Sequence, residues 1–283
     1  MKGEHNQSNG ASENLLCAQG NPKLDGLWDR IRQEALGIAG KEPQLRSLMD
    51  DVFLNRSDFK EAIAARLSRK LAREDMTRDE LLPLWVEILS DHPELVHSMA
   101  HDLLAIHERD PACTGLIQPL MFYKGYKAIS TYRVSHQLWK NDRCDLALYF
   151  QSLASEVFGV DIHPAANIGC GVFLDHATSL VIGETAIVED DVSILHEVTL
   201  GGTGKETGNR HPIVRSGVLI GAGAKILGRV EIGSGAKIGA GSVVLDDVEA
   251  GKTVAGVPAV VVGDSDSANP AHAMDQSLHC SSL

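Results

Sequence analysis

The second half of the chain carries aliphatic residues at a strict six-residue spacing, and this spacing constrains the fold more than any other feature. The residues form three runs: Ile162, Ile168 and Leu174; Ile182, Val188, Ile194 and Leu200; and Ile220, Ile226, Ile232, Ile238 and Val244. A six-residue unit is one short strand and one turn, which buries nothing alone and must stack on its neighbours. The period therefore predicts a parallel β-helix with three units per coil and one aliphatic side chain at each inner corner. The period does not fix the handedness.

The spacing is interrupted twice, and each interruption predicts a loop. Two extra residues stand between Leu174 and Ile182, and a longer excursion, GGTGKETGNRHPIVRSG, separates Leu200 from Ile220. Extra residues in a stacked coil have to bulge outward, and loops on a rigid scaffold commonly carry function. GTGKETG lacks the Ser or Thr after Lys that a Walker-type phosphate loop requires. Residues 200–260 carry seven basic side chains against five acidic ones, and this local balance favours a small polyanionic ligand there.

The first half of the chain has a helical periodicity instead. Apolar residues recur three and four positions apart at residues 59–71, following Ser57, which is a candidate N-cap. Thr77 and Glu80 have the spacing of a capping box ahead of another apolar run. This half is therefore predicted to be a bundle of helices, and its Leu and aromatic stripes are interpreted as core.

The change of period defines the domain organisation. We expect an α+β protein in which an N-terminal α-helical domain at residues 24–160 precedes a β-helix at residues 161–263. Residues 1–23 are polar and are expected to be a disordered N-terminal segment, and residues 264–283 a flexible C-terminal tail.

Charge and hydropathy narrow the classes of partner. The formal net charge of -12 would repel phosphates, so neither nucleic acid nor an anionic membrane is expected as the main partner. The N-terminus lacks the apolar stretch of a secretory signal, and no apolar run has the length of a membrane span. The expected location is the cytoplasm.

Among the 12 histidines, His176 has the most suggestive position. It follows a carboxylate, Asp175, at a turn of the predicted β-helix and directly precedes the first interruption. Asp161 lies close to one coil earlier, so it could approach the His176 ring from the neighbouring layer. Such a carboxylate would fix the imidazole tautomer and stabilise the imidazolium formed during proton transfer. An aspartate near a turn also commonly bonds backbone amides only, so the spacing permits this pair without requiring it.

A metal site is the rival interpretation, because γ-class carbonic anhydrases use the same repeat and bind zinc through three histidines. That family places two ligands five residues apart, whereas Gly201 follows His196 at that distance and Ser216 follows His211. The five cysteines also lack CxxC spacing. We therefore expect no metal.

The motifs together resemble the bacterial serine O-acetyltransferases. In the β-helix half they are DIHPAANIG, DHATSLVIGETA, DVSILHEVTLGGTGK, NRHP, GVLIGAGAKILG, GAKIGAGSVVL and AGVPA. In the helical half, ERDPA followed by QPLMFYKGYKAISTYRVSHQLW is similar to the region that precedes the repeats in that family. The second similarity separates the chain from sugar acetyltransferases, which share only the β-helix. The resemblance implies a left-handed β-helix.

The resemblance also implies roles for individual residues. His176 would be the general base and Asp161 its orienting partner, and Arg210 would bind the serine carboxylate through its planar fork. The remaining amino-acid site would comprise His211, Asp175, Asp110 and Pro111. The coenzyme A site would comprise Gly202, Thr203, Ala222 and Lys237.

The implied activity is acetyl transfer from acetyl-CoA, as co-substrate, to L-serine, the first step of cysteine biosynthesis from serine. The implied assembly is a homohexamer, a dimer of trimers, with sites between neighbouring subunits and with inhibition by cysteine. The family docks its C-terminus into O-acetylserine sulfhydrylase through a terminal Ile, whereas this chain ends in Leu283.

Two other functions remain open from the sequence. One is acyl transfer to another hydroxylated acceptor: Arg210 and Asp110 argue against a sugar but not against homoserine. The other is a non-catalytic assembly protein that keeps the β-helix as a scaffold, which the intact DHAT and NRHP motifs disfavour.

Overall fold

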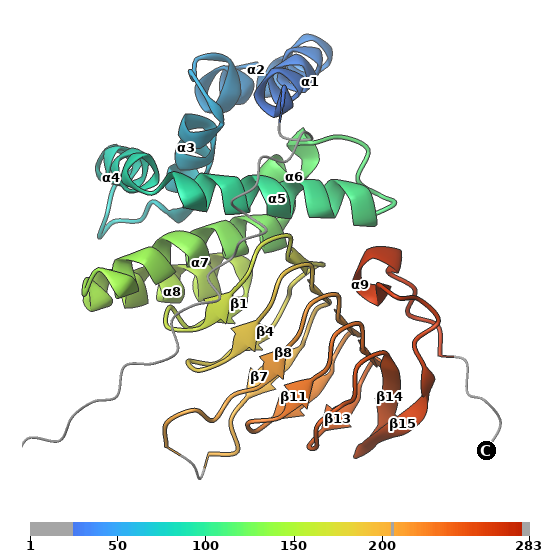
Figure 1. Ribbon diagram of the computed structural model, residues 1–283. Helices are drawn as coiled ribbons and strands as arrows, with labels where there is room; N and C mark the ends of the chain where they lie inside the picture. Colours follow the sequence, from blue (N-terminus) through green and yellow to red (C-terminus); the bar gives the residue numbers. More distant parts are fainter. Residues whose placement is uncertain (1–24, 205–206, 279–283) are drawn as a thin grey trace, which may run out of the picture.

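The computed structural model describes residues 25–204 and 207–278, and shows two parts, a helical layer and a β-helix (Figure 1). The predicted N-terminal segment at residues 1–23 and the terminal Leu283 lie outside the described residues. The C-terminal segment runs back along the side of the β-helix towards the helical layer (Figure 1).

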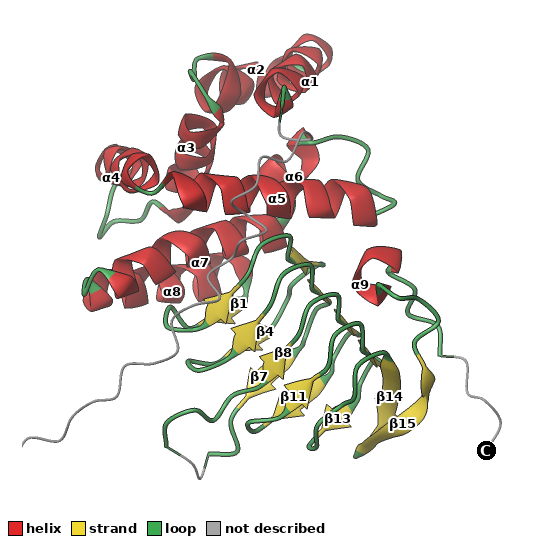
Figure 2. Ribbon diagram, in the orientation of Figure 1, coloured by secondary structure: helices red, strands yellow, loops and turns green. Residues whose placement is uncertain are grey.

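The helical layer is a bundle, as the periodicity predicts (Figure 2). Its helices are α1 (Leu27–Lys41), α2 (Arg46–Met49), α3 (Phe59–Leu71), α4 (Arg78–Asp91), α5 (Pro93–Arg109), α6 (Ile117–Met121), α7 (Lys124–Lys140) and α8 (Cys144–Phe158), with a 3₁₀ turn η2 (Pro43–Leu45) and a π-helical segment η3 (Asp50–Leu54).

The two predicted helix starts differ in outcome. The capping box at α4 is confirmed, because the Thr77 backbone N–H donates to Glu80 Oε2 at 2.8 Å and both halves of the box are formed. The N-cap prediction at α3 is wrong by one residue. Asp58 is the cap, because its extended backbone directs Oδ1 to accept the Glu61 N–H at 2.8 Å. Ser57 instead donates its backbone N–H to Glu61 Oε2.

The strands that follow form three sheets around a triangular core. Sheet A contains β1 (Val160–Ile162), β4 (Leu180–Ile182), β7 (Thr199–Gly201), β10 (Lys225–Leu227) and β13 (Val243–Val244). Sheet B contains β2 (Asn167–Ile168), β5 (Ile187–Val188), β8 (Ile213–Val214) and β11 (Glu231–Ile232). Sheet C contains β3 (Phe173–Leu174), β6 (Ser193–Ile194), β9 (Leu219–Ile220), β12 (Lys237–Ile238), β14 (Lys252–Gly256) and, antiparallel to β14, β15 (Ala259–Asp264).

The predicted aliphatic positions form the core of the β-helix. Each is buried, with at most 6% of its surface exposed. The strands pair in parallel so that Ile162 aligns with Ile182, Ile182 with Leu200, and Leu200 with Ile226. Equivalent side chains therefore stack directly on one another, and the predicted helical half followed by a parallel β-helix is confirmed.

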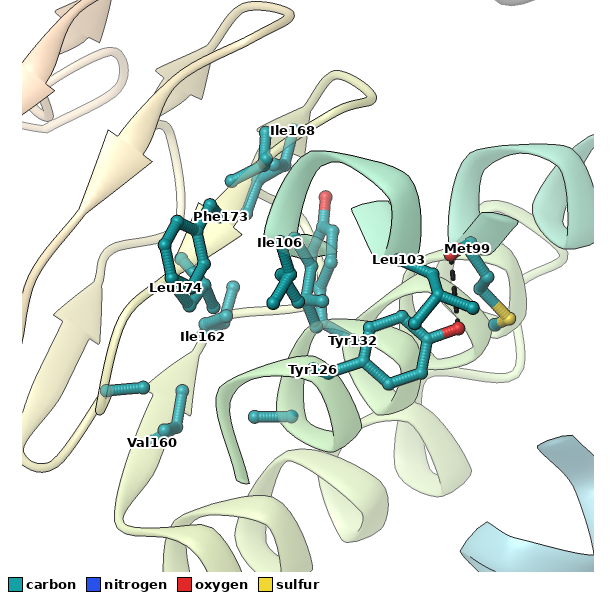
Figure 3. Close-up of a cluster of buried hydrophobic side chains, with 14 of the residues drawn as sticks. Met99, Leu103, Ile106, Tyr126, Tyr132, Val160, Ile162, Ile168, Phe173 and Leu174 are labelled. Carbon is teal, nitrogen blue, oxygen red and sulfur yellow. Dashed lines mark hydrogen bonds between the residues drawn. The ribbon is translucent and has the colours of Figure 1, made fainter. Parts of the chain in front are cut away.

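The two parts share one hydrophobic core, and a buried ion pair of the helical layer makes hydrogen bonds to the backbone of the first coil. Side chains of α5 and α7, including Ile106 and Tyr132, pack on Phe173 and Leu174 of the first coil (Figure 3). Arg133 donates to both oxygens of the fully buried Asp102, at 2.7 and 2.8 Å. Asp102 also accepts the Val172 N–H at 3.0 Å. Both charges are thereby satisfied, and the helices are fixed to the coil that carries His176.

The structure describes residues 264–278 of the segment predicted to be a flexible C-terminal tail. Residues 264–278 lie against sheet C and contain a short helix, α9 (Pro270–Ala273). Its Ala271 donates its N–H to the Gly217 carbonyl at 3.2 Å and accepts a hydrogen bond from Ser193 Oγ at 2.8 Å. Backbone bonding of this kind explains why a polar segment without an apolar stripe can dock. It requires only small residues opposite.

Candidate active site

The turns between the sheets place chemically active side chains at two corners of the β-helix. We call the turns that lead from sheet C to sheet A, after β3, β6 and β9, the His176 corner. We call the turns that lead from sheet A to sheet B, after β1, β4 and β7, the Arg210 corner. The excursion predicted from the second interruption is the long loop after β7, which extends away from the body of the β-helix (Figure 1).

His176 lies on the surface of its corner with a left-handed backbone, φ 54°. Its side chain is 75% exposed. His196 occupies the equivalent place one coil later, since Leu174 and Ile194 are in register, and its ring meets that of His176 edge-on with 5.8 Å between centroids. His196 Nδ1 is buried and has no hydrogen-bond partner among the described residues. Two imidazoles therefore lie side by side, and the outer one is open to a substrate.

Two carboxylates adjoin His176. Asp175 Oδ1 lies 3.9 Å from His176 Nε2. Burial, together with the nearby Asp110 charge, raises the pKa of Asp175, although His176 opposes this shift. Asp110 ends α5 and accepts the Ala112 N–H at 2.8 Å, and the exposed Pro111 follows it. The structure thus brings Asp110, Asp175 and His176 together.

Tyr123 completes this corner from the start of α7. Its hydroxyl donates a hydrogen bond to Asp110, and burial together with that carboxylate raises the pKa of Tyr123 to about 12. The hydroxyl therefore keeps its proton at neutral pH. The two carboxylates, Asp110 and Asp175, thus lie near each other and near the Tyr123 phenol, which favours a positively charged group there.

The Arg210 corner holds the second group of predicted residues. Arg210 Nη2 donates to Glu184 Oε2 at 2.7 Å. His211 is buried beside Gly183, where a Cβ would overlap its ring. Burial and then the Arg210 charge lower the pKa of His211. Its Nδ1 accepts the Thr185 N–H at 3.1 Å, so the neutral ring carries its proton on Nε2.

Asp161 lies on sheet A, between the two corners. Its carboxylate accepts a hydrogen bond from Gln151 Nε2 of α8 at 2.6 Å. Within the part of the chain that the structure describes, no hydrogen bond or ion pair joins Asp161 to His176. The orienting pair inferred from the resemblance is therefore not formed inside this single chain.

The residues predicted for coenzyme A are divided in the same way. Gly202 and Thr203 begin the loop after β7, where a Cβ on Gly202 would lie 3.3 Å from Arg210 Cγ. Ala222 lies in the His176 corner one coil beyond His196, whose carbonyl accepts the Gly223 N–H at 2.9 Å. Lys237 of β12 is 3% exposed and donates from Nζ to the Ser277 carbonyl at 2.5 Å. The C-terminal segment thus covers the only cation of this set.

Sequence reasoning missed the contacts of His196, Glu184 and Tyr123. The six-residue register could have identified His196, because it is the residue aligned with His176 in the next coil. Glu184 lies in the turn after β4, one coil before the long loop that carries Arg210. Nothing in the sequence indicates that these two residues form a pair. Tyr123 reaches Asp110 only through the folding of the loop that connects α5 to α6, which has no periodic signal.

No group of three or more His, Cys, Asp or Glu side chains among residues 25–204 and 207–278 is arranged to hold a metal ion. Within the same described ranges, no helix has both the length and the apolar character needed to cross a membrane.

Comparison with known proteins relates both parts of the chain to one enzyme family. The family model described as "Serine acetyltransferase, N-terminal" matches residues 27–131, and "Bacterial transferase hexapeptide (six repeats)" matches residues 211–246. A serine acetyltransferase of Haemophilus influenzae is 48% identical over 250 residues, which cover 88% of this chain and 94% of that protein.

Solved structures agree over the whole architecture. Serine acetyltransferase from Vibrio cholerae superposes with a TM-score of 0.88 at 48% identity, covering 89% of this chain and 98% of that one. The Brucella abortus serine acetyltransferase in complex with coenzyme A gives a TM-score of 0.84 at 47% identity, covering 87% and 99%. The matches include both the helical layer and the β-helix, and so the chain belongs to the serine acetyltransferase family.

Proposed function

We propose that the chain transfers the acetyl group of acetyl-CoA to the hydroxyl of L-serine, giving O-acetylserine and CoA, and so opens cysteine biosynthesis from serine in the cytoplasm. The observation that carries the proposal is the exposed His176 imidazole beside the Asp110 and Asp175 carboxylates. Relatives give independent support, since related serine acetyltransferases have been solved with coenzyme A, with serine and with cysteine.

His176 acts as the general base in this mechanism. It removes the proton of the serine hydroxyl while that oxygen attacks the thioester carbonyl of acetyl-CoA. The tetrahedral intermediate collapses by breaking the C–S bond, and the imidazolium returns the proton to the CoA thiolate. Positioned proton transfer contributes ~10²- to 10⁴-fold. Juxtaposition of the two substrates supplies a further large part of the rate.

The amino-acid end of serine has two charges, and the two corners carry the matching groups. Asp110 and Asp175 face the ammonium, whose charge relieves the repulsion between these carboxylates. Arg210 and the Nε2–H of His211 bind the carboxylate, for which a planar guanidinium is suited. Glu184 holds Arg210 in place through the 2.7 Å ion pair.

The two corners lie at different edges of one β-helix, so a site that needs both is completed by two copies packed side by side. Cyclic trimers provide three such equivalent sites, and pairing of trimers through the helical layer gives the homohexamer. Asp161 lies on the sheet between the corners, where a neighbouring copy supplies His176 as its partner.

Coenzyme A binds along the contact between neighbouring copies, with Gly202 and Thr203 leaving room for the pantetheine arm and with Ala222 on the other side. Lys237 joins this site when the C-terminal segment that covers it moves away. Cysteine, which differs from serine by one atom, competes at the amino-acid site and inhibits. A complex with O-acetylserine sulfhydrylase through the tail ending in Leu283 is tested by a pull-down with and without the last ten residues.

One assay tests the proposed function directly. Thiol release from acetyl-CoA is measured with serine, homoserine and a hexosamine, for the parent and for His176→Ala. Serine is expected to be the best acceptor, and His176→Ala to lose at least ~10²-fold in kcat while retaining coenzyme A binding. Faster thiol release with homoserine than with serine would make homoserine the substrate. Release with none of them would leave the assembly-protein alternative.

A further inference from the structure

The loop that carries Asp110 connects α5 to α6 and is held at both ends. At its first end, the Asp110 carbonyl accepts the Cys113 N–H at 3.0 Å, and Asp110 Oδ1 accepts the Ala112 N–H at 2.8 Å. The Cys113 thiol donates to the Gly115 carbonyl at 3.3 Å. Hydrogen bonds therefore link Asp110 to Gly115 along the loop.

The second end of this loop is held by a helix far away in sequence. Glu34 of α1 accepts the Leu116 N–H on Oε1 at 3.2 Å and the Ile117 N–H on Oε2 at 2.9 Å. Both amides belong to the first turn of α6 and have no carbonyl within the helix to bond. A carboxylate that accepts two such amides forms charge-assisted hydrogen bonds.

The loop backbone also makes room for this carboxylate. A Cβ placed on Gly115 would lie 2.8 Å from Glu34 Oε2, closer than real Cβ contacts allow. Among the described residues, both hydrogen bonds of the Glu34 carboxylate go to this loop. Glu34 is half-buried, and its charge lies close enough to raise the pKa of the Cys113 thiol, an effect that burial dominates.

We infer that Glu34 is a positioning residue of the amino-acid site, which sets the place of Asp110 by fixing the far end of its loop. The inference rests on the proposed function, because it assumes that Asp110 receives the serine ammonium. It makes α1, a helix that contributes no atom to either corner, part of the machinery that recognises serine.

The test is steady-state kinetics of Glu34→Gln. This change keeps the size of the side chain but replaces one of the two acceptor oxygens by an NH₂ group, which cannot accept the backbone N–H. We expect the serine KM to rise roughly three- to tenfold, which corresponds to the net contribution of about one ordinary hydrogen bond. At saturating serine, kcat and the acetyl-CoA KM should stay within about twofold, because His176 does not depend on this loop. Asp29→Asn, an exposed carboxylate of the same helix, is the matched control and should leave all three values unchanged.

A second variant reaches the same contact from the loop side. Gly115→Ala displaces the Glu34 carboxylate sterically and should raise the serine KM in the same way, so the inference remains testable if Glu34→Gln folds poorly. In an Asp110→Asn background, Glu34→Gln should add no further increase, since both changes act through one group.

Three results would overturn the inference. An unchanged serine KM in folded Glu34→Gln and Gly115→Ala would show that the hydrogen bonds between Glu34 and the loop have a structural role only. Additive effects of Glu34→Gln and Asp110→Asn would show that Glu34 acts by another route. A parent enzyme that releases no thiol with serine would instead refute the proposed function, and this role with it.

Discussion

At the scale of single residues, the site holds two carboxylates in an unfavourable arrangement. Burial and the Asp110 charge raise the pKa of Asp175, so its ionised form is less stable in the folded protein than in the unfolded chain. The stability that Asp175 contributes is therefore lost as the pH rises through this raised pKa. A bound ammonium would remove the conflict, which links the strain at rest to substrate recognition.

Asp175→Asn separates these two effects. We expect a higher Tm than that of the parent at neutral pH, because no buried charge has to be maintained. The difference should shrink as the pH is lowered towards the unfolded aspartate pKa, about 3.9. The serine KM should rise at every pH. Thermal melts between pH 4 and 8 and kinetics between pH 5 and 8 measure these effects, and a lower Tm at neutral pH would contradict the electrostatic account.

At the scale of elements, α7 packs closely on β3, the strand that directly precedes the turn with His176. Gly125, in the first turn of α7, lies against the backbone of Leu174, and a Cβ there would overlap the Leu174 carbonyl. Asp175 and His176 follow that carbonyl directly. The absence of one methyl group therefore allows the helical layer to support the catalytic turn.

Gly125→Ala should lower the free energy of unfolding by about 1–3 kcal/mol, the usual result of overpacking a close contact. It should also reduce kcat with serine, because the displaced strand carries His176. Gly37→Ala in α1 is the control, since a Cβ there meets nothing within 4 Å. Removing a helical glycine at that site should stabilise the protein slightly. Denaturant unfolding measures the free energy of unfolding of both variants, and steady-state kinetics measures their kcat. Equal stability of Gly125→Ala and the parent would contradict the packing argument.

The predictable elements are those whose residues repeat. Ile162 and its equivalents reveal the β-helix because each coil buries the same position, and Thr77 with Glu80 reveals a helix start because capping is local. The contacts that complete the site join segments without a shared period. Glu34 with the α6 amides, Tyr123 with Asp110, and Lys237 with Ser277 arise from tertiary packing, which spacing along the chain does not encode.

At the scale of the whole molecule, the chain is a helical layer fixed to a β-helix through the Asp102–Arg133 pair, with its reactive groups divided between two corners. In the proposed mechanism the His176 corner provides the base and the acidic groups, and the Arg210 corner provides the cation for a carboxylate. One copy carries both halves, but on different edges. The central claim is therefore that a working site is formed from the His176 corner of one copy and the Arg210 corner of the next.

Subunit mixing tests this claim most directly. His176→Ala and Arg210→Ala are each expected to be nearly inactive at serine concentrations below the parent KM. Co-expressed with different tags and purified as mixed oligomers, they should regain about a quarter of the parent activity, because one in four boundaries then pairs two intact corners. Mixed oligomers no more active than the average of the two variants would contradict the claim and place the whole site within one chain.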